Sequence, residues 1–148
     1  MEVRLAYESD EDIVTEMCRA NVSETRPHLT FNEGRCRATF KNYLTFADPT
    51  VFVADEKGEV IGLLVCNFYE HRGADGHTAV QEVLYVRPDK RGTRAAALLM
   101  KELVNWAETI GANEIVGGND NEFNSERTAR FLEHFGFKRV GYAMRREI

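Results

Sequence analysis

Residues 81–99 read QEVLYVRPDKRGTRAAALL, and this stretch decides the fold. The apolar run Val83–Val86 contains two β-branched side chains and predicts a buried strand. Pro88 ends that strand, because proline has no amide N–H to donate to a strand partner. From Ala95 the apolar residues recur at helical spacing, which predicts a helix over 94–110. The stretch is therefore a strand, a tight basic turn and the start of a helix.

The turn itself, Lys90–Arg94, has a physical use. The first amides of a helix have no intrahelical partners, and the helix dipole places partial positive charge there. Gly92 lets the backbone approach a ligand closely, so successive N–H groups can hold a phosphate. Arg91 and Arg94 can add charge-assisted hydrogen bonds. The alternative interpretation is a surface turn with solvated charges, and the turn taken alone favours it.

The composition describes an ordinary globular chain. It has 148 residues, a formal net charge of −5 and 43% hydrophobic residues. This length predicts a single domain over 1–148 with a substantial core. The acidic balance argues against a nucleic-acid partner, because nucleic-acid backbones bind basic surfaces. No apolar segment reaches transmembrane length and no signal region opens the chain, so we expect a cytoplasmic protein without a membrane partner.

The sequence shows no metal site. Its three cysteines, Cys18, Cys36 and Cys66, form no CxxC or Cys/His ligand set, so we expect reduced thiols and no zinc. The polar loop Asn119–Glu122 lacks the spacing of a calcium-binding loop and is better explained as a solvated loop. We therefore predict a protein without a bound metal.

The remaining elements are predicted from apolar spacing and turn residues. We expect a strand near 3–7, helices over 9–20 and 32–46 with a stop at Asp48–Pro49, a hairpin of strands 51–55 and 60–68, a strand over 78–86, a short strand at 114–116, a helix over 125–135 and a last strand or hairpin over 138–145. This order indicates an α+β fold, with a mixed, mainly antiparallel twisted sheet flanked by about four helices.

With these elements in place, the chain resembles the GNAT superfamily of acyl-CoA-dependent N-acetyltransferases. Leu84–Pro88 matches the strand-and-turn signature, and Arg91–Ala96 matches the pyrophosphate turn Q/R-x-x-G-x-G/A. Phe131–Phe137 matches the family's F-Y-E-K-x-G-F helix ending. The resemblance implies a three-layer GNAT-like fold and acetyl-CoA as co-substrate. It also implies direct attack by the primary amine of a small molecule or peptide in a ternary complex. Dimers are common in the family, so a homodimer is a further expectation.

The resemblance also implies which residues bind acetyl-CoA. Backbone groups of Leu84, Tyr85 and Val86 would bind the pantetheine arm and the acetyl carbonyl. The pyrophosphate would be held by the amides of Arg91, Gly92, Thr93, Arg94, Ala95 and Ala96. Ser125 stands where the family often has Asn, and its hydroxyl can still form a hydrogen bond.

An amine acceptor must lose a proton before attack, because an alkylammonium has a pKa near ~10.4. Glu82 is the first candidate for the general base. It shares strand parity with Leu84 and Val86, and the family often uses a Glu on this strand. The alternative is a solvated or salt-bridged strand residue. His77, at the entrance of the strand, is the second candidate, with an exposed loop histidine as its alternative.

Two residues depart from the family pattern. Arg94 replaces the usual middle Gly of the turn, which is compatible with phosphate binding only if its φ is negative. Leu132 replaces the Tyr that protonates the departing thiolate in many members. Other groups that could supply this proton are Glu133, His134, Tyr85 and Tyr142. These departures motivate an alternative function, a catalytically silent GNAT-fold protein that binds CoA or a partner. The enzyme is favoured, since a thiol with a pKa near ~8.5 can leave with solvent protonation.

Overall fold

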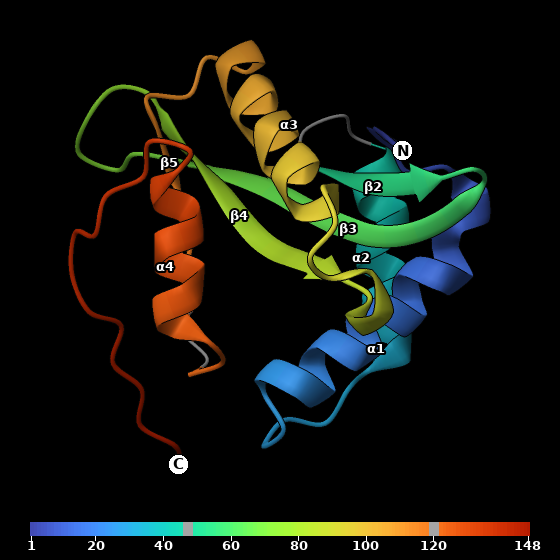
Figure 1. Ribbon diagram of the computed structural model, residues 1–148. Helices are drawn as coiled ribbons and strands as arrows, with labels where there is room; N and C mark the ends of the chain where they lie inside the picture. Colours follow the sequence, from blue (N-terminus) through green and yellow to red (C-terminus); the bar gives the residue numbers. More distant parts are fainter. Residues whose placement is uncertain (46–48, 119–121) are drawn as a thin grey trace.

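A computed structural model gives the fold, and the structure describes residues 1–45, 49–118 and 122–148. The elements run in the order β1 (Glu2–Leu5), α1 (Glu11–Thr25), α2 (Glu33–Thr45), β2 (Thr50–Glu56), β3 (Glu59–Glu70), β4 (His77–Val86), α3 (Ala95–Thr109), β5 (Glu114–Val116) and α4 (Ser125–Glu133) (Figure 1). Short 3-10 turns precede α1 (Glu8–Asp10) and follow β4 (Pro88–Lys90).

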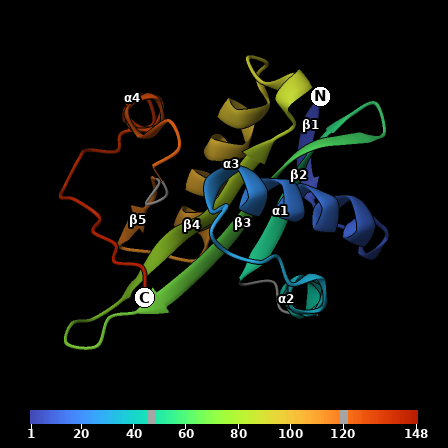
Figure 2. The ribbon, with the colours of Figure 1, turned by 90° about the horizontal axis from the view of Figure 1, so that it is seen from below.

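The strands form one five-stranded sheet in the order β1-β2-β3-β4-β5. Strands β1 to β4 pair with one another in antiparallel fashion, whereas β5 runs parallel to β4. Helix α3 covers one face of the sheet, and α1 and α2 cover the other (Figure 2). The predicted α+β class, with a mixed and mainly antiparallel sheet, is therefore confirmed.

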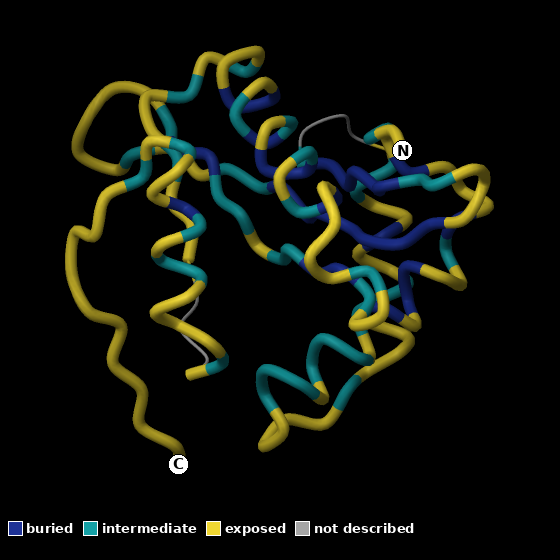
Figure 3. The backbone as a smooth tube through the Cα atoms, viewed as in Figure 1, coloured by how far each residue is buried: buried dark blue, intermediate teal, exposed yellow. Residues whose placement is uncertain are grey.

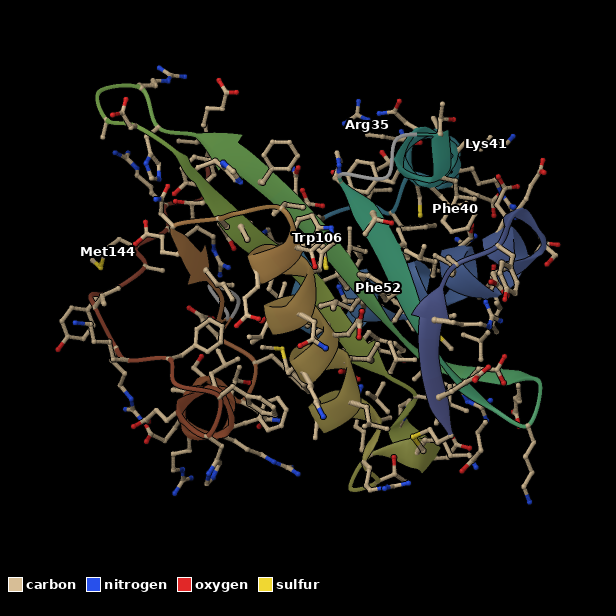
Figure 4. All side chains as sticks on the ribbon, turned by 90° about the horizontal axis from the view of Figure 1, so that it is seen from above. Arg35, Phe40, Lys41, Phe52, Trp106 and Met144 are labelled. Atoms are coloured by element: carbon tan, nitrogen blue, oxygen red, sulfur yellow. The ribbon has the colours of Figure 1, made fainter. Side chains whose placement is uncertain are left out.

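Each face of the sheet has its own core. On the α3 face, Leu99, Leu103 and Trp106 are buried against the strands, as their helical spacing predicted. On the opposite face, Phe40 of α2 is 3% exposed. Figure 4 shows Trp106 and Phe40 on opposite sides of the sheet, with Arg35 of α2 on the solvent side. Burying one large apolar side chain contributes about 1.5–3 kcal/mol, so these two cores fix both helix layers.

The middle of β4 contains a β-bulge at Glu82. Val83 pairs with Val65 of β3 and Gln81 pairs with Cys66, which leaves Glu82 as the extra residue. A bulge places two successive side chains on one face of a sheet. The expected parity of Glu82 with Leu84 is therefore wrong, and Glu82 lies instead on the face that carries α1 and α2, with Val83.

Strands β4 and β5 separate after a short parallel pairing. The pairing covers only Thr78–Val80 of β4, opposite the three residues of β5. Gly117 follows β5 directly, and a Cβ there would lie 2.9 Å from the amide oxygen of Gln81. A side chain at position 117 would therefore have to displace the amide group of Gln81.

One predicted helix boundary and one predicted strand were wrong. Helix α1 continues to Thr25 rather than ending at Ala20, and the N–H of Arg26 still donates to the carbonyl of Val22. The strand predicted over 138–145 is irregular backbone, because no strand within the described residues pairs with it. The predicted helix stop at Asp48 and the loop residues 119–121 lie outside the described residues. None of the described helices combines the length and apolarity needed to cross a membrane.

The three cysteines are free thiols. A hydrogen bond from the Cys18 thiol lowers the pKa of Cys36, and burial raises the pKa of Cys66. Because the thiolate is the nucleophile, alkylation of Cys36 by iodoacetamide should rise with pH and reach half its maximal rate below the pKa of a free thiol. Cys66 should stay unmodified in the folded protein. Peptide mass spectrometry across a pH series measures the alkylation of both cysteines. If the alkylation rate of Cys36 reaches half its maximum near pH ~8.5, the value of a free thiol, the lowered pKa of Cys36 is wrong.

Candidate active site

A cleft of about 440 Å³ follows β4 and continues past the basic turn. Helix α1 forms one wall, and the start of α4 forms the other. Clefts of roughly 300–1,000 Å³ are typical of small-molecule and cofactor sites. The lining side chains and backbone come from Asn21, Glu24, Thr25, residues 81–86, residues 90–93, Ala96, Gly118, Phe123, Asn124, Arg127, Thr128 and Phe131.

The strand segment expected to bind pantetheine lies along this cleft. Leu84, Tyr85 and Val86 all contribute to the lining. Because β5 pairs only as far as Val80, the edge of β4 on that side has no partner strand beyond Val80 within the described residues. An extended ligand with amide groups could pair with this edge as a strand would.

The turn presents several amides at the start of α3. Gly92 has a φ of +86°. Arg94, which replaces the usual middle Gly of the turn, has a φ of −75°, and this is the negative φ that phosphate binding by the turn requires. Among the described residues, no hydrogen bond uses the backbone amides of Gly92, Arg94, Ala96 or Ala97. Such amides at a helix start favour an anion.

The other turn amides are only weakly engaged. Arg91 and Thr93 donate to carbonyl oxygens at 3.4 Å, and Ala95 donates to the Thr93 hydroxyl at 3.3 Å. Arg91, Gly92, Thr93 and Ala96 line the cleft, whereas Arg94 and the fully buried Ala95 do not. The expected turn is thus beside the cleft, with its middle residues facing it.

The side chain of Arg91 spans the cleft instead of extending into solvent. Its Nη2 donates to Glu24 of α1 at 2.6 Å, and its Nε donates to the carbonyl of Val86 at 3.0 Å. Its guanidinium carbon lies 5.5 Å from the centre of the Tyr85 ring. Arg91 therefore ties the end of β4 to the last turn of α1 and brings positive charge into the cleft.

Glu82 faces the cleft from the bulge, and two side chains orient its carboxylate. The hydroxyl of Tyr43 on α2 donates to it at 3.1 Å, and the side-chain amide of Asn67 on β3 donates at 2.6 Å. The Asn67 amide is itself fixed, because its oxygen accepts from the N–H of Phe68 at 2.8 Å. Burial and the neighbouring Glu82 raise the pKa of Tyr43 to about 12, so the phenol remains a donor at neutral pH.

His77 lies at the far end of β4 and does not line the cleft. Its Nε2 is 2.9 Å from the carbonyl oxygen of Ile110, and its backbone N–H donates to Asn113. Its ring packs edge-on against Phe68. These contacts join the start of β4 to the end of α3.

The residues considered on α4 and beyond occupy different positions. Ser125 is exposed and outside the lining, although its neighbour Asn124 belongs to it. Leu132 is 5% exposed and packs in the α3-face core. Glu133 and His134 are exposed, and Tyr142 is 97% exposed. Of the proton donors considered, Tyr85 is the one that lines the cleft, and burial raises its pKa.

Sequence reasoning missed one wall of the cleft and the residues that hold Glu82. Asn21, Glu24 and Thr25 lie in the part of α1 that was predicted as an irregular link. The contact of Tyr43 with Glu82 was not predicted, and Asn67 was not singled out. The helical spacing of Val22 after Cys18 could have indicated the longer helix.

The mixed sheet thus forks between β4 and β5, next to the start of α3. The profile of the Acetyltransferase (GNAT) family matches residues 14–137. This match covers most of the sequence, and the chain belongs to the GNAT acetyltransferase family.

Solved structures show the same fold over nearly the whole chain. A transcriptional regulator from Bacillus halodurans is 19% identical, with a TM-score of 0.80 over 99% of this chain and 98% of the other. Glucosamine-6-phosphate N-acetyltransferase from Arabidopsis thaliana is 14% identical, with a TM-score of 0.79 over 99% and 97%. A predicted acetyltransferase from Clostridium acetobutylicum, solved with acetyl-CoA, is 18% identical, with a TM-score of 0.78 over 99% and 95%. No curated protein matches the chain significantly.

Among the described residues, no group of three or more His, Cys, Asp or Glu side chains is placed to hold a metal ion.

Proposed function

We propose that this protein is an N-acetyltransferase that transfers the acetyl group of acetyl-CoA to a primary amine of a small molecule or peptide. One observation carries the proposal: a single cleft connects the amides of the Gly92 turn with the oriented carboxylate of Glu82. The first feature suits a diphosphate, and the second suits an ammonium that must lose a proton. Use of acetyl-CoA is general in the family to which the chain belongs.

The cleft also fits the pantetheine arm of acetyl-CoA. Gln81 lines the cleft at the fork, and its buried Oε1 has no hydrogen-bond partner in the described structure. A buried acceptor without a partner costs about 1–3 kcal/mol, so a ligand N–H that reaches it would be favoured. The pantetheine arm carries two amide N–H groups. The open edge of β4 offers further hydrogen bonds of the same kind.

In the proposed reaction Glu82 removes a proton from the ammonium of the acceptor, directly or through a water molecule. The amine nitrogen then attacks the thioester carbonyl carbon. The new C–N bond forms, the C–S bond breaks, and the thiolate of CoA leaves and takes a proton from solvent. Amides of β4 that face the cleft would stabilise the negative charge on the carbonyl oxygen. The amide product releases its second proton to solvent.

A thiol-release assay tests this function. The purified protein is mixed with acetyl-CoA and separate amines: a polyamine, an aminoglycoside, an amino acid and a lysine peptide. We expect amine-dependent release of CoA thiol with at least one acceptor class, together with the acetylated amine in the mass spectrum. Binding of acetyl-CoA without turnover of any acceptor would favour the alternative, a silent CoA-binding protein. Buried Leu132, which cannot donate a proton, is the observation that favours that alternative.

Arg91 supplies positive charge beside the turn, which gives a prediction on cofactor affinity. Arg91→Ala should weaken CoA binding about 10-fold, since a charge-assisted contact is lost and Glu24 is left unpaired in the cleft. Pantetheine, which has no phosphate, should lose less than about two-fold. Arg87→Ala is the matched control, because Arg87 pairs with Asp89 outside the cleft. Equal losses for CoA and pantetheine in calorimetry would contradict a phosphate role.

A further inference from the structure

The same three residues, Cys-Arg-Ala, occur in both helices that cover the second face of the sheet. They are Cys18–Ala20 in α1 and Cys36–Ala38 in α2. The two helices pack against each other, and their Cα atoms come within 8 Å. In this packing the Cys18 thiol donates a hydrogen bond to the sulfur of Cys36. Two thiols from separate helices are therefore in direct contact.

Ion pairs on both sides of this contact align the two helices. Arg19, which follows the first cysteine, donates to Glu33 of α2 at 2.7 Å. Arg37, which follows the second cysteine, donates to Asp12 of α1 at 2.7 Å and to Glu11 at 3.0 Å. A single exposed pair contributes little to stability. Together these pairs restrict how α1 and α2 can slide, and the thiol contact lies between them.

The surroundings make Cys36 the more reactive thiol of the two. The hydrogen bond from Cys18 lowers the pKa of Cys36 against the opposing effect of burial. The positive charge of Arg37 and a hydrogen bond with the Thr15 side chain lower this pKa further. The same contact, together with burial, raises the pKa of Cys18. Since the thiolate is the form that attacks an oxidant, Cys36 reacts first and leaves Cys18 beside it as an intact thiol.

Burial separates this pair from the third cysteine. Cys18 and Cys36 are half-buried, whereas Cys66 of β3 is 0% exposed. Figure 3 shows the same contrast, with the middle of β3 buried and many half-buried or exposed residues along α1 and α2. Cys66 belongs to the core on the α3 face, on the other side of the sheet. The folded chain therefore brings together one pair of thiols and keeps the third apart.

We propose that Cys18 and Cys36 are a redox-sensitive pair that hydrogen peroxide converts to a disulfide between α1 and α2. The Cys36 thiolate attacks one peroxide oxygen, the O–O bond breaks, and the hydroxide that leaves takes up a proton to become water. Cys36 is then a sulfenic acid. The Cys18 thiol attacks the sulfenic sulfur, the S–S bond forms, and a second water leaves. The two thiols lose two electrons, which reduce the peroxide, and a thiol reductant reverses the change.

The disulfide would join the two helices that shape the cleft. Helix α1 forms a wall of the cleft through Asn21 and its neighbours, and α2 carries Tyr43, which donates to Glu82. A covalent link between these helices fixes Tyr43 relative to that wall. The proposal does not depend on the acetyltransferase activity, because neither cysteine lines the cleft.

Mass spectrometry of the folded, full-length protein after treatment with hydrogen peroxide tests the proposal. We expect the intact mass to fall by about 2 Da, the two thiol hydrogens, and dithiothreitol to restore it. Peptide mapping should find Cys18 linked to Cys36, with Cys66 alkylated only after unfolding. The same treatment in concentrated urea should lose this selectivity. If both thiols of the pair remain free, or if the disulfide includes Cys66 or joins two chains, the proposal is wrong.

Three serine variants test the order of the two steps. Cys18→Ser should stop at the sulfenic acid of Cys36, which dimedone captures. Cys36→Ser should oxidise at least about 10-fold more slowly than the natural chain, because the more reactive thiol is gone. Cys66→Ser is the matched control and should form the disulfide at the natural rate. No dimedone adduct in Cys18→Ser, or rapid oxidation of Cys36→Ser, would contradict the assigned roles.

The melting temperature of the oxidised protein tests whether the two thiols are already aligned. A disulfide formed without moving the helices restricts the unfolded chain, so the oxidised form should melt about 5–10 °C above the reduced form. Cys18→Ser and Cys36→Ser should lose this gain, whereas Cys66→Ser should keep it. An oxidised form that melts at the same temperature or lower would mean that the helices must move to form the bond, and would overturn the proposed pair.

Discussion

Glu82→Gln should lower kcat about 100- to 1,000-fold while the KM for acetyl-CoA changes little, because a general base typically contributes 10²- to 10⁴-fold. Glutamine keeps the size of the side chain and its hydrogen bonds to Tyr43 and Asn67, but it cannot accept a proton. Because the variant cannot accept the proton of the acceptor ammonium, its dependence of kcat on pH should differ from that of the natural protein. Steady-state kinetics across a pH series measure both effects.

The control for this prediction is Glu70→Gln. Glu70 is an exposed carboxylate at the end of β3 and does not line the cleft, so kcat and the pH profile should stay unchanged. Tyr43 does not contribute to the pH dependence near neutral pH, because burial and Glu82 raise its pKa to about 12. If Glu82→Gln keeps the natural pH profile, Glu82 is not the base.

Gly92→Ala is the second change with a large expected effect, here on cofactor affinity. Gly92 has a φ of +86°, where a side chain strains the backbone by roughly 1–2 kcal/mol. The turn relieves this strain by changing the direction of its amides, so the dissociation constant for CoA should rise about 10- to 100-fold. Calorimetric titration of CoA into the variant measures this change.

Gly58→Ala is a matched control for the backbone strain. Gly58 has a φ of +87° at the β2–β3 turn, and a Cβ at either glycine meets no atom within 4 Å. Both variants should therefore lose a similar free energy of unfolding, whereas only Gly92→Ala should lose affinity for CoA. An equal loss of affinity in both variants would mean that general destabilisation, not the turn, is responsible.

The parts of the fold that rest on local patterns could be predicted from the sequence. The apolar face of α3 and the turn at Pro88 and Gly92 were predicted from a few neighbouring residues. This was possible because the spacing of apolar side chains and the backbone preferences of proline and glycine are local properties. The parallel β4–β5 pair followed from the crossover helix between them. The family turn and the strand beside it therefore lie where the sequence indicated, along one cleft.

The parts that rest on pairing between distant segments could not be predicted. The bulge at Glu82 depends on how β3 and β4 align, and the alternation of β4 alone gave the wrong face. The ion pair between Arg91 and Glu24 joins residues 67 positions apart and requires the longer α1. The strand expected over 138–145 has a strand-like pattern, but a pattern forms a strand only where a partner edge is within reach.

The most direct test of the central claim is isothermal titration of acetyl-CoA into the natural protein. We predict one site per chain, with a dissociation constant between about 1 μM and 1 mM, the usual range of enzyme KM values. Gly58→Ala should bind equally well, and Gly92→Ala should bind more weakly. If neither acetyl-CoA nor CoA binds to the natural protein, the cleft beside β4 is not an acetyl-CoA site and the proposed transferase activity is wrong.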